Sequence, residues 1–356
     1  MKINELKVAL EKKKSGCAVF FNSDSSRKSP NLLYFAGYGG LGALAIPSKK
    51  QPFLIVPEME FQRAKKSMIG KVYSMERKNF FGSVYKIIRK NNISVKSVAI
   101  DKNNFTLGSF KHFKRQFRKS KIKDISPDCM KLRVTKTGKE MQFLKKSCNY
   151  ADKLVQKAIR DFSSFKTESE AAAFLEYEAK KLGLGLSFDP IVASGSNGSM
   201  PHHEPSSARL KDGFCILDFG VKYKGYCSDI TRTIFIGTPS GKEKEMYNML
   251  LEIQKAAISE VHENKKCSEL YDFVAGKLGK YKKYFVHGLG HGVGVEIHEM
   301  PNLAANSKDK IQNSMAFTVE PGIYFPKKFG IRIEDTIFFK NKPIPLTKTS
   351  KDLIIV

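Results

Sequence analysis

Two aspartates with ten residues between them, Asp218 and Asp229, place the strongest constraint on how this chain can fold. The apolar residues before Asp218 predict a buried strand that ends in an acid, and a turn at Lys224-Gly225 leads to a second strand that carries Asp229. A hairpin of this spacing brings the two carboxylates side by side. Such a pair is costly in an apolar setting unless a cation neutralises it. Aspartate at a strand end is also a common turn former, so a structural role stays open at this point.

A cluster of histidines follows farther along the chain. His287, His291 and His298 lie within twelve residues, in a chain that has only seven histidines, and four glycines are interspersed among them. These glycines argue against a helix that would present His287 and His291 as a zinc-binding pair, and the cluster contains no H-E-x-x-H motif. Glycine lets the backbone approach a site closely, and histidine supplies neutral nitrogen ligands or proton carriers. The cluster therefore predicts a functional site rather than core packing.

Two glutamates, Glu320 and Glu334, each lie in or at the end of an apolar, strand-like segment. An unpaired carboxylate is expensive in such a position. Near Glu334, isoleucines alternate with Arg332 and Glu334, which places these two charged side chains on one face of the strand. Because Asp335 follows directly, a solvated strand end is the alternative interpretation of this segment.

The order and local context of these residues (Asp, Asp, His, Glu, Glu) resemble the metallopeptidase family of methionine aminopeptidase, aminopeptidase P and prolidase. The resemblance is strongest from Arg133 to Ile337, and the segment Asn31-Leu-Leu-Tyr-Phe-Ala-Gly37 is similar to the family's N-terminal domain. It implies an α+β architecture. Its main part is a pita-bread catalytic domain, in which helices cover a curved antiparallel sheet with pseudo-twofold symmetry, and a smaller α/β domain precedes it. We expect these domains at residues 133–356 and 1–132.

Short apolar runs bounded by Pro, Gly or charged residues predict four buried strands in the first domain, and the alternation of strands with helices is typical of an α/β domain. These runs are Cys17–Phe21, Leu41–Ile46, Phe53–Val56 and Ser97–Ile100. Helical spacing predicts helices over residues 59–68, 82–91 and 141–162. The pattern Thr167-Glu-Ser-Glu170 predicts the capped start of a further helix.

The family resemblance implies two divalent metal ions per subunit. The five ligands that it implies by motif are Asp218, Asp229, His291, Glu320 and Glu334. The resemblance also implies that Asp229 bridges or chelates both ions and that Glu334 bridges them. Four carboxylates and one imidazole favour Mn²⁺, with Co²⁺, Zn²⁺ and Fe²⁺ as alternatives. Two adjacent cations share a hydroxide and lower its pKa, so that it attacks at neutral pH.

The other histidines near the motif have counterparts in the family that face the substrate. Of the adjacent pair, His202 matches the motif position, and we expect His203 to be a bystander. His298 matches the histidine that contacts the substrate carbonyl or the tetrahedral intermediate, and His287 resembles a position that lines the proline pocket. Glu320 doubles as a metal ligand and a proton shuttle. The resemblance therefore implies His202, His298 and Glu320 as catalytic residues.

Two features favour the Xaa-Pro branch of the family. Methionine aminopeptidases usually lack a separate N-terminal domain like the one expected at 1–132. Arg332, two residues before Glu334, resembles an arginine of the Xaa-Pro enzymes, and we expect it to pair with Asp229 or its neighbours and to join the substrate-binding residues. We therefore predict hydrolysis of the Xaa-Pro bond at peptide N-termini through a metal-bridging hydroxide, as in aminopeptidase P. Prolidase, which cleaves only Xaa-Pro dipeptides, shares every residue named and is the alternative. Creatinase is disfavoured because its chemistry does not require the full metal set.

The charge of the chain is unevenly distributed. The net charge is +27, and residues 1–133 hold 29 basic and 9 acidic residues. The densest run, Lys111–Lys119, is of the kind that attracts nucleic acid, anionic membrane or acidic peptides. A solvated helix face is the simpler interpretation, because no nucleic-acid-binding motif accompanies the charge. A non-catalytic binding member of the fold is the remaining alternative, but such relatives typically lose metal ligands, and all five are present here.

Six scattered cysteines form no C-x-x-C pair, which predicts free buried thiols. No apolar stretch approaches the roughly 20 residues needed to cross a bilayer. The N-terminal segment is polar and charged, unlike the apolar region of a signal peptide. We expect a cytoplasmic peptidase that acts on proline-containing peptides, and the family resemblance implies a homodimer.

Overall fold

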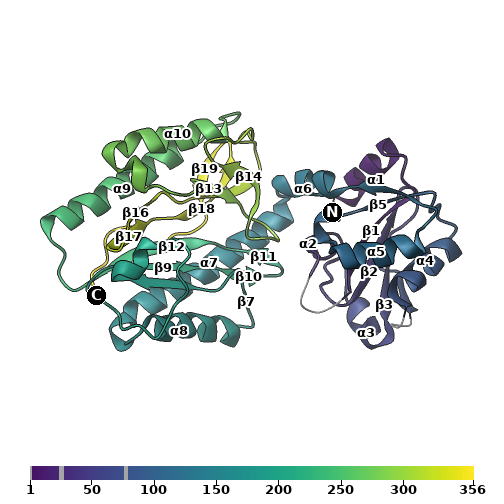
Figure 1. The fold of residues 1–356 in the computed structure, drawn as a ribbon, viewed down its shortest axis with the longest axis horizontal. Coiled ribbons are helices and arrows are strands. Elements are labelled where there is room, and N and C mark those ends of the chain that lie inside the picture. Colours follow the sequence, from purple (N-terminus) through teal and green to yellow (C-terminus); the bar gives the residue numbers. More distant parts are fainter. Residues whose placement is uncertain (1, 24–27, 76–78) are drawn as a thin grey trace. The chain divides into compact units, whose positions relative to one another are not determined.

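The computed structural model describes residues 2–23, 28–75 and 79–356. The chain divides into two compact units, residues 1–132 and 133–356, which are described separately (Figure 1). Within the described parts of the chain, no helix combines the length and the apolar character needed to cross a membrane. All six cysteines are buried free thiols, as the sequence predicts.

A six-stranded mixed sheet forms the centre of the first unit, with strand order β4-β3-β2-β1-β5-β6. Its strands are β1 (Cys17–Asn22), β2 (Gly42–Pro47), β3 (Phe53–Pro57), β4 (Val72–Met75), β5 (Ser97–Ile100) and β6 (Lys121–Asp124). β1 pairs antiparallel with β2 and parallel with β5. The four strands predicted from apolar runs are confirmed, because they coincide with β1, β2, β3 and β5.

Helices cover both faces of this sheet, which explains why its strands are continuous apolar runs. In β1, Ala18 and Phe20 pack into one hydrophobic cluster, while Cys17, Val19 and Phe21 pack into another. The helices are α1 (Ile3–Lys12), α2 (Pro30–Ala36), α3 (Phe61–Ala64), α4 (Phe80–Lys90), α5 (Leu107–Gln116) and α6 (Ser126–Val134).

The helix expected over residues 59–68 is wrong in length. The chain forms only a 3₁₀ turn (Glu58–Glu60) and the single-turn helix α3 there. Only Ala64 of α3 is buried, so the segment lacks the apolar face that stabilises a longer helix. The helix expected over residues 82–91 is confirmed as α4.

Four long helices belong to the second unit: α7 (Gly138–Arg160), α8 (Glu168–Lys181), α9 (Gly241–Ser259) and α10 (Cys267–Lys277). Thr137 and Glu140 form a reciprocal capping box at the start of α7, which confirms the helix predicted over 141–162. The Thr167 side chain accepts a hydrogen bond from the Glu170 backbone N–H, so the predicted start of α8 is also confirmed.

The strands of the second unit lie between the α7/α8 pair and the α9/α10 pair (Figure 1). All of their pairings are antiparallel among the described strands. Two sheets have three strands each: β12-β9-β8 (Ile230–Ile236, Gly213–Phe219, Ile191–Ser194) and β11-β10-β7 (Tyr226–Cys227, Val221–Tyr223, Gly185–Leu186). A further sheet is the two-stranded ribbon β16-β17 (Gly322–Phe325, Phe329–Arg332). The five-stranded sheet has the order β14-β13-β15-β18-β19 (Glu299–Leu303, Gly290–Gly292, Met315–Val319, Asp335–Lys340, Lys342–Pro345).

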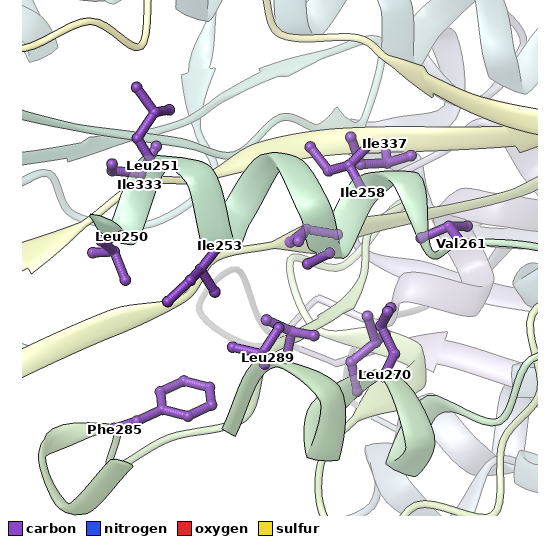
Figure 2. Packing of buried hydrophobic residues seen from close by; sticks show 14 of the residues in the cluster. Leu250, Leu251, Ile253, Ile258, Val261, Leu270, Phe285, Leu289, Ile333 and Ile337 are labelled. Carbon is purple, nitrogen blue, oxygen red and sulfur yellow. The ribbon is translucent and has the colours of Figure 1, made fainter. Parts of the chain in front are cut away.

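The apolar core fixes which faces of these strands remain available for polar groups. Figure 2 shows side chains of α9, including Leu251 and Ile258, packed near Ile333 and Ile337, which flank Glu334 in sequence. On the other side of the unit, Leu217 and other residues of β9 pack against α7 and α8. Side chains alternate along a strand, so Asp218 points away from the face that Leu217 occupies.

Candidate metal centre

The two aspartates are positioned by nested hairpins. In the inner hairpin, β10 and β11 are joined by Lys224 and Gly225, whose φ angles are 52° and 86°. Positive φ at both turn residues matches the twist of the flanking strands. In the outer hairpin, β9 pairs with β12 so that Asp218 lies opposite Thr231, and Asp229 directly precedes β12. The hairpin predicted from the sequence is therefore confirmed.

Side chains from three separate segments converge at one point. Ligand atoms of Asp229, His291 and Glu334 all lie within 4.8 Å of one another. His291 Nε2 lies 3.5 Å from Asp229 Oδ2 and 3.3 Å from Glu320 Oε1. The charge of Asp218 raises the pKa of both Asp229 and Glu334. The five residues that the sequence singles out thus form one charge cluster.

Crowding of buried carboxylates perturbs their protonation. Burial raises the pKa of Asp229 and of Glu334 well above the ordinary value, and the neighbouring carboxylates raise both further. Burial acts in the same direction on Glu320, but the hydrogen bond and the charge of His291 outweigh it and lower its pKa to about 2. Four acids in a buried cluster with one histidine leave excess negative charge, which a cation offsets.

Two oxygens of this cluster show how a cation fits. Asp218 Oδ1 and Glu334 Oε1 are buried, and neither has a hydrogen-bond partner among the described residues. Buried polar atoms are normally paired, because an unpaired one costs about 1–3 kcal/mol or more. Carboxylate oxygens and a histidine nitrogen are ligands for divalent ions such as Mn²⁺. The residues present therefore suit the metal site that the sequence implies.

Arg332 organises one side of the cluster. Its Nη2 donates to Asp218 Oδ2 at 2.6 Å, and its Nε donates to Thr231 Oγ1 at 3.2 Å. Thr231 in turn donates to Glu334 Oε2 at 2.7 Å. The expected pairing of Arg332 with Asp229 or its neighbours is thus made to Asp218, and a single arginine orients two carboxylates of the cluster.

His202, His287 and His298 lie around this centre but do not belong to the cluster of Asp229, His291 and Glu334. His287 Nε2 lies 2.9 Å from the Tyr324 hydroxyl, and the ring centroids of His298 and His291 are 4.3 Å apart. Burial lowers the pKa of both His287 and His298, and the charge of His202 lowers each further. His202, His287 and His298 therefore lie within electrostatic reach of one another, and low pKa values keep the last two neutral near pH 7.

Sequence reasoning missed residues that orient this centre. The Tyr324 hydroxyl accepts a hydrogen bond from Arg332 Nη1 at 2.7 Å. Thr318 Oγ1 donates to Glu320 Oε1 at 3.0 Å and accepts from the His291 backbone N–H. Thr231 and Thr318 are buried polar residues within apolar strands, and that pattern is the signal that points to them.

Antiparallel sheets between two helix pairs, together with a buried cluster of carboxylates and histidine, define a metal-dependent hydrolase of the pita-bread fold. The chain belongs to metallopeptidase family M24, whose model matches residues 142–341. The model of the creatinase/prolidase N-terminal domain matches residues 2–135. The predicted family and the two-part α+β architecture are therefore confirmed.

Relatives and solved structures agree with this assignment. The Xaa-Pro dipeptidase of Pyrococcus furiosus is 36% identical over 334 residues, which cover 92% of this chain and 93% of the relative. The crystal structure of the prolidase from Pyrococcus horikoshii matches with a TM-score of 0.89 at 33% identity, over 99% of both chains. The X-Pro aminopeptidase of Thermotoga maritima matches with a TM-score of 0.88 at 28% identity, over 97% of this chain and 99% of that chain.

Proposed function

We propose that this chain hydrolyses the peptide bond between an N-terminal residue and proline. The observation that carries the proposal is the cluster of Asp229, His291 and Glu334, beside which Asp218 and Glu334 each present an unpaired buried oxygen. Similarity to Xaa-Pro dipeptidases over nearly the whole chain favours dipeptides as substrates. Longer Xaa-Pro peptides are the second candidate, favoured by the similarity to an X-Pro aminopeptidase.

The proposed cofactor is a pair of divalent ions, with Mn²⁺ as the expected metal. The residues that would hold them are Asp218, Asp229, His291, Glu320 and Glu334. When bound, the ions supply a nucleophilic hydroxide at neutral pH and polarise the scissile carbonyl. Thr318 Oγ1 donates to one oxygen of Glu320 at 3.0 Å and fixes its orientation. Glu320 is assigned the transfer of a proton to the leaving proline nitrogen, a role that a positioned carboxylate can take.

Substrate recognition is assigned to the surrounding histidines. His298 and His202 can donate hydrogen bonds to the carbonyl oxygen as negative charge develops on it. His287 is held by Tyr324 at 2.9 Å and is suited to line the pocket for the proline ring. In a peptide bond the proline nitrogen carries no hydrogen, so an enzyme cannot bind an N–H there and recognises the ring through a pocket instead.

The same proposal assigns roles to the two parts of the chain. Residues 133–356 form the catalytic domain, residues 1–132 form the N-terminal domain, and the expected assembly is a homodimer. Six buried free thiols are typical of a protein in the reducing cytoplasm.

A peptide-cleavage assay tests the function. The purified chain is incubated with Mn²⁺ and either Gly-Pro or Gly-Pro-Ala, with and without EDTA. We expect release of glycine that EDTA abolishes and that excess Mn²⁺ restores. Cleavage of Gly-Pro alone identifies a dipeptidase, and cleavage of Gly-Pro-Ala identifies an aminopeptidase. If neither peptide yields glycine in a metal-dependent manner, the proposed function is wrong.

A further inference from the structure

One buried carboxylate outside the metal centre collects hydrogen bonds from a single loop. Glu168, the first residue of α8, is fully buried, and every hydrogen-bond partner of its carboxylate among the described residues lies in residues 194–206. It accepts from the Ser194 backbone N–H at 2.9 Å and from Asn197 Nδ2 at 3.0 Å. The ring nitrogen Nε2 of His203 lies 2.8 Å from Glu168 Oε2. Because an ionised carboxylate only accepts, His203 donates in this contact.

The protonation of Glu168 agrees with this geometry. Burial acts to raise the pKa of Glu168, but hydrogen bonds from Ser194, His203 and Asn197 outweigh it, and the net shift is downward. The carboxylate is therefore ionised at neutral pH. Hydrogen bonds to an ionised acceptor are about twice as strong as those between neutral groups. Glu168 is thus a firm anchor for the loop.

The same loop is also held by β17. Arg332 Nη1 donates to the Pro201 carbonyl at 3.2 Å while another nitrogen of the same guanidinium binds Asp218. Farther back in the loop, Gly198 lies against Gly330 so closely that a Cβ added to Gly330 would be 1.9 Å from the Gly198 carbonyl oxygen. The loop and the strand that carries Arg332 are therefore in tight backbone contact.

These anchors fall on both sides of His202. Pro201 is held through its carbonyl by Arg332, and His203 is held through its ring by Glu168. The His203 side chain is only 10% exposed, whereas the neighbouring His202 is exposed. The nitrogen of Arg332 that binds the Pro201 carbonyl also donates to the Tyr324 hydroxyl, which lies 2.9 Å from His287 Nε2, so the chain at His202 lies beside a substrate-facing histidine.

We propose that His203 and Glu168 are positioning residues that fix His202 for substrate binding, an inference that rests on the proposed function. His203 is then no bystander. With its ring held inward by Glu168, the backbone at 203 is fixed and the adjacent imidazole projects outward. Displacement of a substrate-contacting group by about 1 Å can lower activity about 100-fold. Loss of the His203 anchor therefore affects catalysis through His202.

The test compares five variants, among them His202→Ala, in cleavage of Gly-Pro by the Mn²⁺-loaded enzyme. His203→Ala removes the donor to Glu168, and we expect kcat/KM to fall roughly 10- to 100-fold. His203→Gln places an amide N–H where Nε2 was, and we expect it to restore most of this loss. His262→Ala removes an exposed histidine remote in sequence from the loop, and we expect wild-type activity. The double variant His202→Ala/His203→Ala is expected to match His202→Ala alone, because His203 acts through His202.

A second readout is independent of activity. Hydrogen exchange of peptides that span residues 195–206, followed by mass spectrometry on the full chain, reports how firmly the loop is held. We expect faster exchange in His203→Ala than in wild type or in His262→Ala. Equal exchange and equal kcat/KM in His203→Ala and wild type overturn the inference. A double variant whose loss of kcat/KM is the product of the losses in His202→Ala and His203→Ala also overturns it, because the two residues would then act independently. If the wild-type enzyme does not cleave Gly-Pro or Gly-Pro-Ala, the proposed function fails instead, which is a separate outcome.

Discussion

Arg332 donates to one oxygen of Asp218 at 2.6 Å, and the other oxygen of that carboxylate is buried without a hydrogen-bond partner among the described residues. The guanidinium fixes the orientation of the carboxylate and leaves the free oxygen for a cation. A hydrogen bond to the outer oxygen of a metal ligand is a general way to orient that ligand. Arg332 also contacts Thr231, which binds Glu334, so one side chain sets the geometry of two proposed ligands.

Substitution of Arg332 tests this arrangement. Arg332→Lys keeps the positive charge but cannot reach Asp218, Thr231 and Tyr324 together, because an ammonium lacks the planar fork of a guanidinium. We expect the affinity for Mn²⁺ and the value of kcat/KM to fall about 10- to 100-fold. Calorimetric titration of the metal-free protein with Mn²⁺ measures the first quantity. Arg332→Lys with unchanged Mn²⁺ affinity and activity would show that the fork is not required.

The proposed metal ligands Glu334 and Asp229 are tested by metal content. Glu334→Ala and Asp229→Ala each remove a buried carboxylate from the cluster, and we expect loss of bound metal and of activity with the fold largely intact. Asp212→Ala removes an exposed acid from the same unit and serves as the control. Elemental analysis of the dialysed proteins measures the metal per chain. Two metals per chain retained in Glu334→Ala would contradict the assignment of this residue.

Local sequence signals were sufficient for the hairpin and for most helices and strands. The Lys224-Gly225 turn and the capping box at Thr137 depend on residues that are neighbours in the chain, so their chemistry is visible in the sequence. Spacing and residue type also singled out the acids and His291 that converge. The helix expected over 59–68 was too long, because helical spacing alone does not establish that an apolar face will be buried.

Other features depend on contacts between residues that are distant in the chain. His203 bonds to Glu168 across 35 positions, and Arg332 bonds to Pro201 across 131 positions. No local pattern specifies which of two adjacent histidines points inward, since the answer depends on the position of Glu168, a buried carboxylate in α8. Tyr324 was missed for the same reason, because its hydroxyl gains its role from Arg332 and His287.

An ion cluster beside His298 predicts a pH-dependent contribution to stability. Glu299 is paired with Lys136 at 2.8 Å and with Arg133 at 3.2 Å. Burial acts to raise the pKa of Glu299, but the charges of Lys136 and Arg133 outweigh it and lower the pKa below its ordinary value of 4.5. Because its pKa is lower in the folded chain than in the unfolded chain, the carboxylate stabilises the fold fully at pH values above its ordinary pKa. This stabilisation is lost as the pH falls through the lowered pKa of the folded chain.

Glu299→Gln removes that charge and leaves two buried cations less compensated. We expect the free energy of unfolding at pH 7 to fall by about 3 kcal/mol or more. The difference from wild type should narrow only below pH 4.5, where Glu299 begins to protonate in the unfolded wild-type chain. Urea unfolding of both proteins at pH 7, 5 and 4 measures this difference in the free energy of unfolding. Glu252→Gln, in an exposed pair with Lys255, should change stability by less than about 1 kcal/mol. A Glu299→Gln deficit that does not depend on pH would contradict the role of the charge.

The contact between Gly198 and Gly330 gives a prediction about activity without any change of charge. A methyl group on Gly330 would lie 1.9 Å from the Gly198 carbonyl oxygen, so in Gly330→Ala the loop that carries His202 must move by more than 1 Å. We expect a loss of stability of about 1–3 kcal/mol, typical of overpacking, and a loss of kcat/KM approaching about 100-fold.

Gly276→Ala is the matched control. Gly276 lies in α10, and a methyl group there would meet no atom within 4 Å. Alanine in a helix interior is better than glycine by about 1 kcal/mol, so this variant should be slightly more stable and fully active. Thermal unfolding curves identify a temperature at which both variants are folded. Activity is compared at that temperature, so that a loss of activity reports a change of site geometry and not a loss of the fold. If folded Gly330→Ala were as active as Gly276→Ala, the position of the loop would not limit catalysis. The tight backbone contact would then serve the fold alone.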